Sequence, residues 1–100
     1  MRVIATKHIR EFSQKHPRAK QALLAWAEEA RKASWQAPQD IKENYRTASF
    51  LGRNRVVFNI KGNEYRLVAA VAYRFQVVYV KFIGTHAAYD AIDAETIELE

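Results

Sequence analysis

The stretch from Val56 to Asp90 constrains the fold of this 100-residue chain more than any other part of it. It contains three apolar runs, rich in Val, Tyr, Phe and Ile, that are separated by two short polar turns. The first turn is Lys61-Gly62-Asn63-Glu64, where Gly and Asn accept positive φ at little cost, and Arg74-Phe75-Gln76 is a weaker second turn. The pattern predicts an antiparallel meander of three strands, which span Arg55–Ile60, Tyr65–Tyr73 and Val77–Ile83.

Two helices are predicted upstream of the meander. The first carries Ile9 and Phe12 on one face and should end near His16, because the residue before a proline avoids the α region. Pro17 suits the first turn of the second helix. The apolar stripe of that helix consists of Ala19, Ala22, Leu23, Trp26, Ala27 and Ala30. The stripe needs a partner, so we expect one α+β domain, residues 1–100, with two N-terminal helices packed on a small antiparallel sheet.

Shorter elements complete the predicted fold. Met1–Ile4 favours a short edge strand, and Pro38 can begin a helical turn that continues through Ile41 and Tyr45. Trp26 and Trp35 are interpreted as core residues, because large aromatic side chains bury the most apolar area.

The composition excludes several classes of protein. The chain has no cysteine, which excludes disulfides and zinc-thiolate sites. No apolar run approaches the ~20 residues that a membrane span needs, and the N-terminus lacks the apolar region of a signal peptide. The common nucleotide-binding and hydrolase motifs are absent as well. These features fit a cytoplasmic protein without a membrane partner.

Charge is distributed unevenly along the chain. Four of the 11 acidic residues lie in the last eight positions, so residues 1–90 carry 16 basic and 7 acidic side chains. A body this basic suits a polyanion such as RNA, DNA or an acidic protein. The alternative is a soluble surface that is merely basic. The acidic C-terminus could be a frayed end, a last strand or helix, or a screen over basic groups.

Alternation along the predicted strands separates two faces of the sheet. Arg66 shares one face of the middle strand with small apolar residues, and in the last strand Tyr79, Lys81 and Ile83 share a face. Both faces are largely apolar, so we expect one to pack on the helices and the other to form a partly open concave surface. Arg66 either pairs with Glu64 or a helix carboxylate, or it clamps a phosphate, whose geometry matches the guanidinium fork.

A second polar group follows the last strand. The imidazole of His86 is suited to proton transfer near neutral pH. Tyr89 and Asp90 lie three and four residues further on, so both would adjoin His86 in a helical turn and form an acid–base corner. Alternatively, Thr85 caps a helix in which His86 only fills space, and Tyr89 is a half-buried aromatic ring.

The order of these motifs resembles that of the HigB family of bacterial toxins. The similar segments are FNIKGNEYRLVAAVAY and GTHAAYD, preceded by an opening VIATKHIREFSQKHP, a helix with a central Trp and a PQDIK turn. The resemblance implies a RelE/ParE-like α+β fold. It implies an endoribonuclease that cuts mRNA, typically on the ribosome, and a HigA-like antitoxin with a helix-turn-helix domain. The pair would bind operator DNA through the antitoxin.

The resemblance also suggests a role for each candidate residue. Arg66 matches the arginine of the YR strand and would clamp the phosphate, while His86 and Tyr89 match the THxxY segment and would serve in acid–base chemistry and positioning. Neither a metal nor another cofactor is implied, because the 2′-hydroxyl of RNA can act as the nucleophile. Residues expected to contact RNA are Lys61 and Asn63 at the turn and, with weaker support, Lys81, Arg53 and Arg55.

A second reading remains open at this point. A non-enzymatic RelE/ParE-like toxin or binding module could use the same basic sheet against a protein target. Such a module has no need of an acid–base corner, so Arg66, His86 and Tyr89 favour the ribonuclease.

Overall fold

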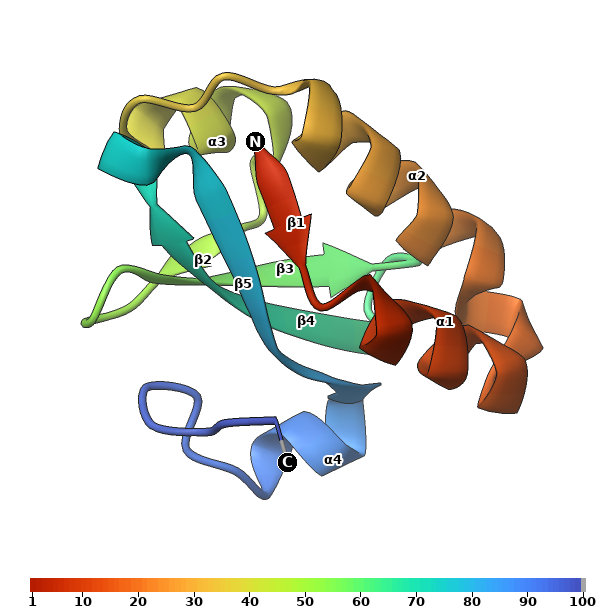
Figure 1. The fold of residues 1–100 in the computed structure, drawn as a ribbon. Coiled ribbons are helices and arrows are strands. Elements are labelled where there is room, and N and C mark those ends of the chain that lie inside the picture. Colours follow the sequence, from red (N-terminus) through yellow and green to blue (C-terminus); the bar gives the residue numbers. More distant parts are fainter. Residues whose placement is uncertain (100) are drawn as a thin grey trace.

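The fold is described by a computed structural model that covers residues 1–99, with a five-stranded sheet at its centre (Figure 1). The strands are β1 (Arg2–Ile4), β2 (Ser49–Phe50), β3 (Arg55–Ile60), β4 (Tyr65–Ala72) and β5 (Val77–Thr85). The helices are α1 (Thr6–Lys15), α2 (Lys20–Lys32), α3 (Pro38–Asn44) and α4 (His86–Asp90), with 3-10 turns η1 (Pro17–Ala19) and η2 (Tyr73–Phe75). The predicted α+β class is confirmed. No helix within residues 1–99 has the length and apolar character to cross a membrane.

The predicted meander is confirmed, because β3, β4 and β5 pair antiparallel in sequence order. Lys61 and Gly62 adopt positive φ in the first turn. The second turn begins at Tyr73 instead of Arg74, because η2 spans Tyr73–Phe75, and Gln76 after it adopts a positive φ of 56°. The sheet is mixed, however. β1 is the predicted edge strand, but it pairs parallel to β5 and gives the order β1-β5-β4-β3-β2, so the expected antiparallel pairing does not hold at that edge.

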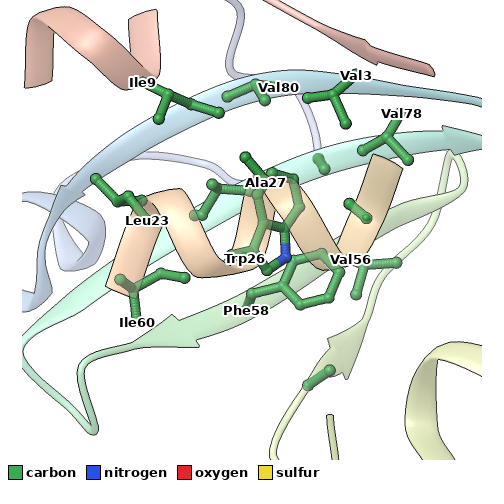
Figure 2. Close-up of a cluster of buried hydrophobic side chains, with 14 of the residues drawn as sticks. Val3, Ile9, Leu23, Trp26, Ala27, Val56, Phe58, Ile60, Val78 and Val80 are labelled. Atoms are coloured by element: carbon green, nitrogen blue, oxygen red, sulfur yellow. The ribbon is translucent and has the colours of Figure 1, made fainter. Parts of the chain in front are cut away.

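The main core lies between the sheet and the pair α1 and α2 (Figure 2). Trp26 of α2 packs edge-on against Phe58 of β3, with ring centroids 5.2 Å apart. Trp35 stacks on the same ring at 6.3 Å. Both tryptophans are almost completely buried, which confirms their assignment to the core. The helices α1 and α2 thus cover one face of the sheet. A different part of the chain covers the other face.

The opposite face of the sheet is covered by residues 91–99, called the C-terminal segment, together with α4 (Figure 1). A second apolar cluster forms there around Val57 and Val68, with the surrounding residues Leu51, Phe82, Tyr89, Ile92 and Ala94. The expectation of a partly open concave face is therefore wrong over this area. The apolar side chains Ile92 and Ala94 explain why the chain returns to the sheet after α4.

Hydrogen bonds from one buried arginine hold the C-terminal segment in place. Arg55, which is 4% exposed, donates from Nη1 to the carbonyls of Ala94, at 3.0 Å, and Ile97. Its Nη2 donates to the carboxylate of Glu98, which also accepts from Lys81 Nζ at 2.7 Å. The hydrogen bond from Lys81, with a smaller contribution from Arg55, lowers the pKa of Glu98. Of the alternatives for the acidic C-terminus, a screen over basic groups matches the structure.

A β-bulge changes which face of the sheet the side chains of β5 lie on. Val68 pairs with Phe82 and Ala69 with Val80, so Lys81 between them has no partner on β4. The extra residue shifts the alternation. As a result Ile83 packs against the main core and Phe82 against the second cluster. The expectation that Tyr79, Lys81 and Ile83 share a face is therefore wrong for Ile83, whereas Lys81 Nζ lies 5.7 Å from the centroid of the Tyr79 ring.

Candidate active site

The candidate site lies where the β3–β4 turn, β5 and α4 meet at one end of the sheet. Arg66 of β4 pairs with Gly84 of β5, two residues before His86 begins α4. The backbone N–H of His86 donates to the carbonyl of Glu64 at 3.1 Å. Through this bond the turn and the start of α4 are held together, which places Arg66 and His86 at the same end of the sheet.

The guanidinium of Arg66 is not neutralised by a carboxylate within residues 1–99. Its Nη1 donates only to the backbone carbonyls of Asn63 and Tyr65, each at 3.2 Å. Glu64, the predicted alternative partner, forms its ion pair with Arg18 at 2.9 Å instead. The side chain of Arg66 is partly exposed. A half-buried cation of this kind can accept a phosphate without first breaking an ion pair.

His86 forms a hydrogen-bonded pair with a carboxylate. Its Nδ1 lies 3.1 Å from Oδ2 of Asp90, four residues later on α4. The short helix starts where predicted, because the Thr85 hydroxyl accepts from the N–H of Ala88 at 3.1 Å. Both members of the pair are exposed. The carboxylate orients the ring and leaves Nε2 available for proton transfer.

Tyr89 lies beside this pair, but its ring belongs to the apolar cluster under α4. It packs against Phe82 with ring centroids 6.5 Å apart, and it is half-buried. The Phe82 ring in turn lies over Gly84, where an added Cβ would come within 2.5 Å of it. The structure thus matches the half-buried reading for the Tyr89 ring, and a role for its hydroxyl in chemistry stays a prediction.

The turn residues lie at the edge of the site. Lys61 and Asn63 are exposed, and Asn63 offers its carbonyl to Arg66. Asn59 pairs directly with Arg66 across β3 and β4 and is partly exposed, although it was not among the predicted residues. The signal that identifies it is a polar side chain in the otherwise apolar run VVFNI, on the face that also carries Val57.

The remaining predicted RNA contacts lie elsewhere. Arg53 is exposed but sits in the turn before β3, roughly 20 Å along that strand from the site. Arg55 and Lys81 are bound to the C-terminal segment through Glu98, so neither offers a free cation in this structure. The neighbours of Arg55 and Lys81, which are distant in sequence, determine what these two residues bind in the structure.

The site lacks a cluster of metal ligands within the described residues. Across residues 1–99, His, Asp and Glu side chains do not gather in groups of three or more that could hold one. The acid–base pair of the site, His86 and Asp90, consists of two such residues only. The side chains at this corner are of types that can transfer a proton and stabilise negative charge.

Comparisons with known proteins identify the family of this chain. Residues 19–92 match the model of the HigB toxin family, described as the RelE-like toxic component of a toxin–antitoxin system. The chain is 30% identical over 97 residues to the mRNA interferase toxin HigB of Escherichia coli K12, a match that covers 94% of this chain and 92% of the relative. The mRNA interferases HigB of Escherichia coli O157:H7 and Shigella flexneri give the same values. The chain therefore belongs to the HigB family of RelE-like toxins, the toxic components of toxin–antitoxin systems.

Proposed function

We propose that this toxin is an endoribonuclease that cleaves mRNA, in the cytoplasm and on the translating ribosome, at the corner formed by Arg66, His86 and Tyr89. The observation that carries the proposal is the Arg66 guanidinium, which contacts only backbone carbonyls within residues 1–99 and lies at the same end of the sheet as the His86–Asp90 pair. The mRNA interferase names of relatives 30% identical to this chain support the same reaction.

The proposed reaction uses the 2′-hydroxyl of the RNA itself as nucleophile and needs no cofactor. A base takes the proton of this hydroxyl, its oxygen forms a bond to phosphorus, and the bond from phosphorus to the 5′-oxygen breaks. The departing 5′-oxygen receives a proton, which leaves a 2′,3′-cyclic phosphate and a 5′-hydroxyl. Arg66 stabilises the extra negative charge on the phosphate oxygens, where a well-placed donor is worth ~3 kcal/mol.

Proton transfer is assigned to His86, with Tyr89 as the second group. His86 is held through Nδ1 by Asp90, so Nε2 exchanges the proton. Tyr89 lies on the same helix, next to Asp90. Lys61 and Asn63, exposed at the turn beside Arg66, would contact neighbouring phosphates or bases. Arg53 lies too far along β3 for the same nucleotide, and Arg55 and Lys81 bind the C-terminal segment.

The partners follow from the toxin–antitoxin assignment. A cognate antitoxin would neutralise the toxin, and we propose a HigA-like helix-turn-helix protein that carries the pair to operator DNA. The excess of basic over acidic residues in 1–90 suits mRNA and the ribosome, both of which are polyanions.

Expression of the wild type and Arg66→Ala from a tightly controlled promoter tests the proposal. We expect the wild type to arrest growth and to create new 5′ ends in mRNA. Arg66→Ala should lower the cleavage rate about 100-fold, because one electrostatic donor is lost. Arg74→Ala is the matched control, since Arg74 is exposed in η2 at the far end of β4. Arrest without RNA cleavage would instead favour a toxin that acts on a protein target.

A further inference from the structure

A row of side chains crosses the sheet beside the C-terminal segment, at a distance from the catalytic corner (Figure 1). Tyr79 of β5 pairs with Ala70 of β4, and Ala70 pairs with Arg55 of β3. Directly paired residues lie on the same face of a sheet, so Tyr79 and Arg55 stand on either side of the small Ala70. Tyr79 is 39% exposed, and Lys81 Nζ lies 5.7 Å from its ring centroid. The row thus combines an open aromatic ring with two cations.

A carboxylate of the chain itself bridges these two cations. Glu98 accepts through Oε1 from Lys81 Nζ at 2.7 Å and through Oε2 from Arg55 Nη2. The Glu98 side chain is 57% exposed, whereas that of Arg55 is buried. Two oxygens of one phosphate can bridge the same two donors, because guanidinium and ammonium groups bind carboxylates and phosphates alike. The exposed carboxylate can therefore be exchanged for a phosphate that arrives from solvent.

We propose that Tyr79, Lys81 and Arg55 form a second nucleotide site for single-stranded RNA, in which Glu98 holds the place of a phosphate. A base stacks on the Tyr79 ring, and the adjacent phosphate displaces the Glu98 carboxylate from Lys81 and Arg55. Aromatic rings combined with cations bind single strands in this way, because every base has a face that can stack. The inference rests on the proposed ribonuclease and adds a substrate contact for which the C-terminus of the chain competes.

The second nucleotide site and the catalytic corner lie on the same face of the sheet. Arg66, Val68 and Ala70 alternate along β4, and Val68 belongs to the cluster beneath the C-terminal segment. Arg66 and Ala70 are four residues, or roughly 13 Å, apart along the strand. An RNA strand held at Arg66 therefore reaches Tyr79 with a nucleotide that flanks the scissile phosphate. Loss of this contact should weaken RNA binding and leave the chemical step unchanged.

The test titrates purified toxin with a short single-stranded RNA whose 2′-hydroxyls are methylated, at several salt concentrations, so that binding is measured without cleavage. Tyr79→Ala should weaken binding about 5- to 100-fold, the range for loss of one stacked base, with an unchanged salt dependence. Lys81→Gln should also weaken binding and reduce the slope of log K against log salt by about 0.7, because one phosphate contact is lost. Phe50→Ala is the matched control, since Phe50 is 38% exposed and lies 5.9 Å from Lys42 Nζ, but at the opposite edge of the sheet.

Glu98→Gln tests the competition between the carboxylate and the RNA. The variant should bind the methylated RNA about three- to fivefold more tightly, because an exposed ion pair of this strength no longer opposes the phosphate. Glu95→Gln removes the same charge from an exposed position of the same segment and should have a clearly smaller effect. Equal effects of the two substitutions would overturn the role of Glu98, because net charge alone would then explain the change.

The kinetics of RNA cleavage provide the second readout. Tyr79→Ala and Lys81→Gln should raise KM and leave kcat at the value of the wild type. Wild-type affinity for the methylated RNA in both variants would overturn the proposal. If Tyr79→Ala does not fold, Tyr79→Leu decides. A toxin that binds the methylated RNA through this site but cleaves no RNA refutes the proposed enzyme only.

Discussion

Arg66 and His86 lie at the same end of the sheet, but their neighbours prepare them for different tasks. Arg66 keeps an uncompensated positive charge, because its contacts within residues 1–99 are backbone carbonyls. His86 Nδ1 lies within hydrogen-bond distance of the Asp90 carboxylate, which favours one orientation of its ring. The first arrangement suits a phosphate, and the second suits the transfer of a proton.

His86→Ala should reduce the rate of RNA cleavage by about 10²–10⁴, which is the usual contribution of a general acid or base. Asp90→Asn should reduce the rate of RNA cleavage by a smaller factor, because the imidazole of His86 remains and only its orientation and its charged partner change. Single-turnover cleavage of a short mRNA on ribosomes measures both effects. Glu43→Gln, an exposed acidic residue on α3, is the control. Equal rates for His86→Ala and wild type would remove His86 from the proposed mechanism.

The positions of these side chains follow from local rules that a sequence contains. Strand alternation and the register of a short hairpin predict where Arg66 points, and the i, i+4 spacing predicts the pairing of His86 with Asp90. The binding partners of Arg55 and Lys81 are not local. Both reach Glu98, 43 and 17 residues further along the chain, so no local pattern predicts this pairing.

At the scale of elements, α4 depends on the C-terminal segment that follows it. The segment and Tyr89 of α4 share the second apolar cluster, and Arg55 fixes the segment through carbonyls and a carboxylate. A buried arginine with three hydrogen bonds to one segment stabilises the chain around it, because removal of the arginine leaves its acceptors unsatisfied. Arg55 therefore acts as a structural anchor for the C-terminal segment.

Arg55→Ala should lower the free energy of unfolding by ~1–3 kcal/mol, the range for leaving a buried polar partner unsatisfied. It should also accelerate amide hydrogen exchange in residues 91–99. Arg53→Ala provides the control, since Arg53 is exposed in the preceding turn. Urea unfolding and hydrogen exchange measure the two effects. Unchanged exchange in the C-terminal segment would contradict the anchoring role.

The elements differ in how well the sequence predicts them. Turn residues and apolar periodicity fix the meander and the two helices, because these signals involve neighbours along the chain. The parallel pairing of β1 with β5 joins residues about 75 positions apart, as in Arg2 with Val77. The bulge at Lys81 depends on how β4 and β5 adjust to one another. Neither has a local signal, so both emerge only in the structure.

Over the whole molecule, charge separates into a basic body and an acidic C-terminus that lies against it. Glu98 is the contact between the two, because it accepts from both Lys81 and Arg55. The pKa of Glu98 is lowered in the folded chain, chiefly by the hydrogen bond from Lys81. Ionised Glu98 therefore stabilises the fold at pH values above its pKa in the unfolded chain. This stabilisation is lost as the pH falls through the pKa of Glu98 in the folded chain.

Acidification should release the C-terminal segment before the rest of the fold. Above the ordinary glutamate pKa of 4.5 the segment should be docked, and below that value its amide exchange should rise as Glu98 becomes protonated. Hydrogen exchange followed by mass spectrometry between neutral and acidic pH measures this step. Glu98→Gln should show raised exchange already at neutral pH and a weaker pH dependence. A pH response identical to that of the wild type would exclude Glu98 as the titrating group.

The chemistry of the RNA ends tests the central claim most directly. Purified toxin should cleave mRNA on translating ribosomes and leave a 2′,3′-cyclic phosphate on one fragment and a 5′-hydroxyl on the other. Arg66→Ala should slow the same reaction about 100-fold, with an unchanged unfolding midpoint. Fragments that carry a 5′-phosphate, or an undiminished rate for Arg66→Ala, would contradict attack by the 2′-hydroxyl with Arg66 as the phosphate clamp.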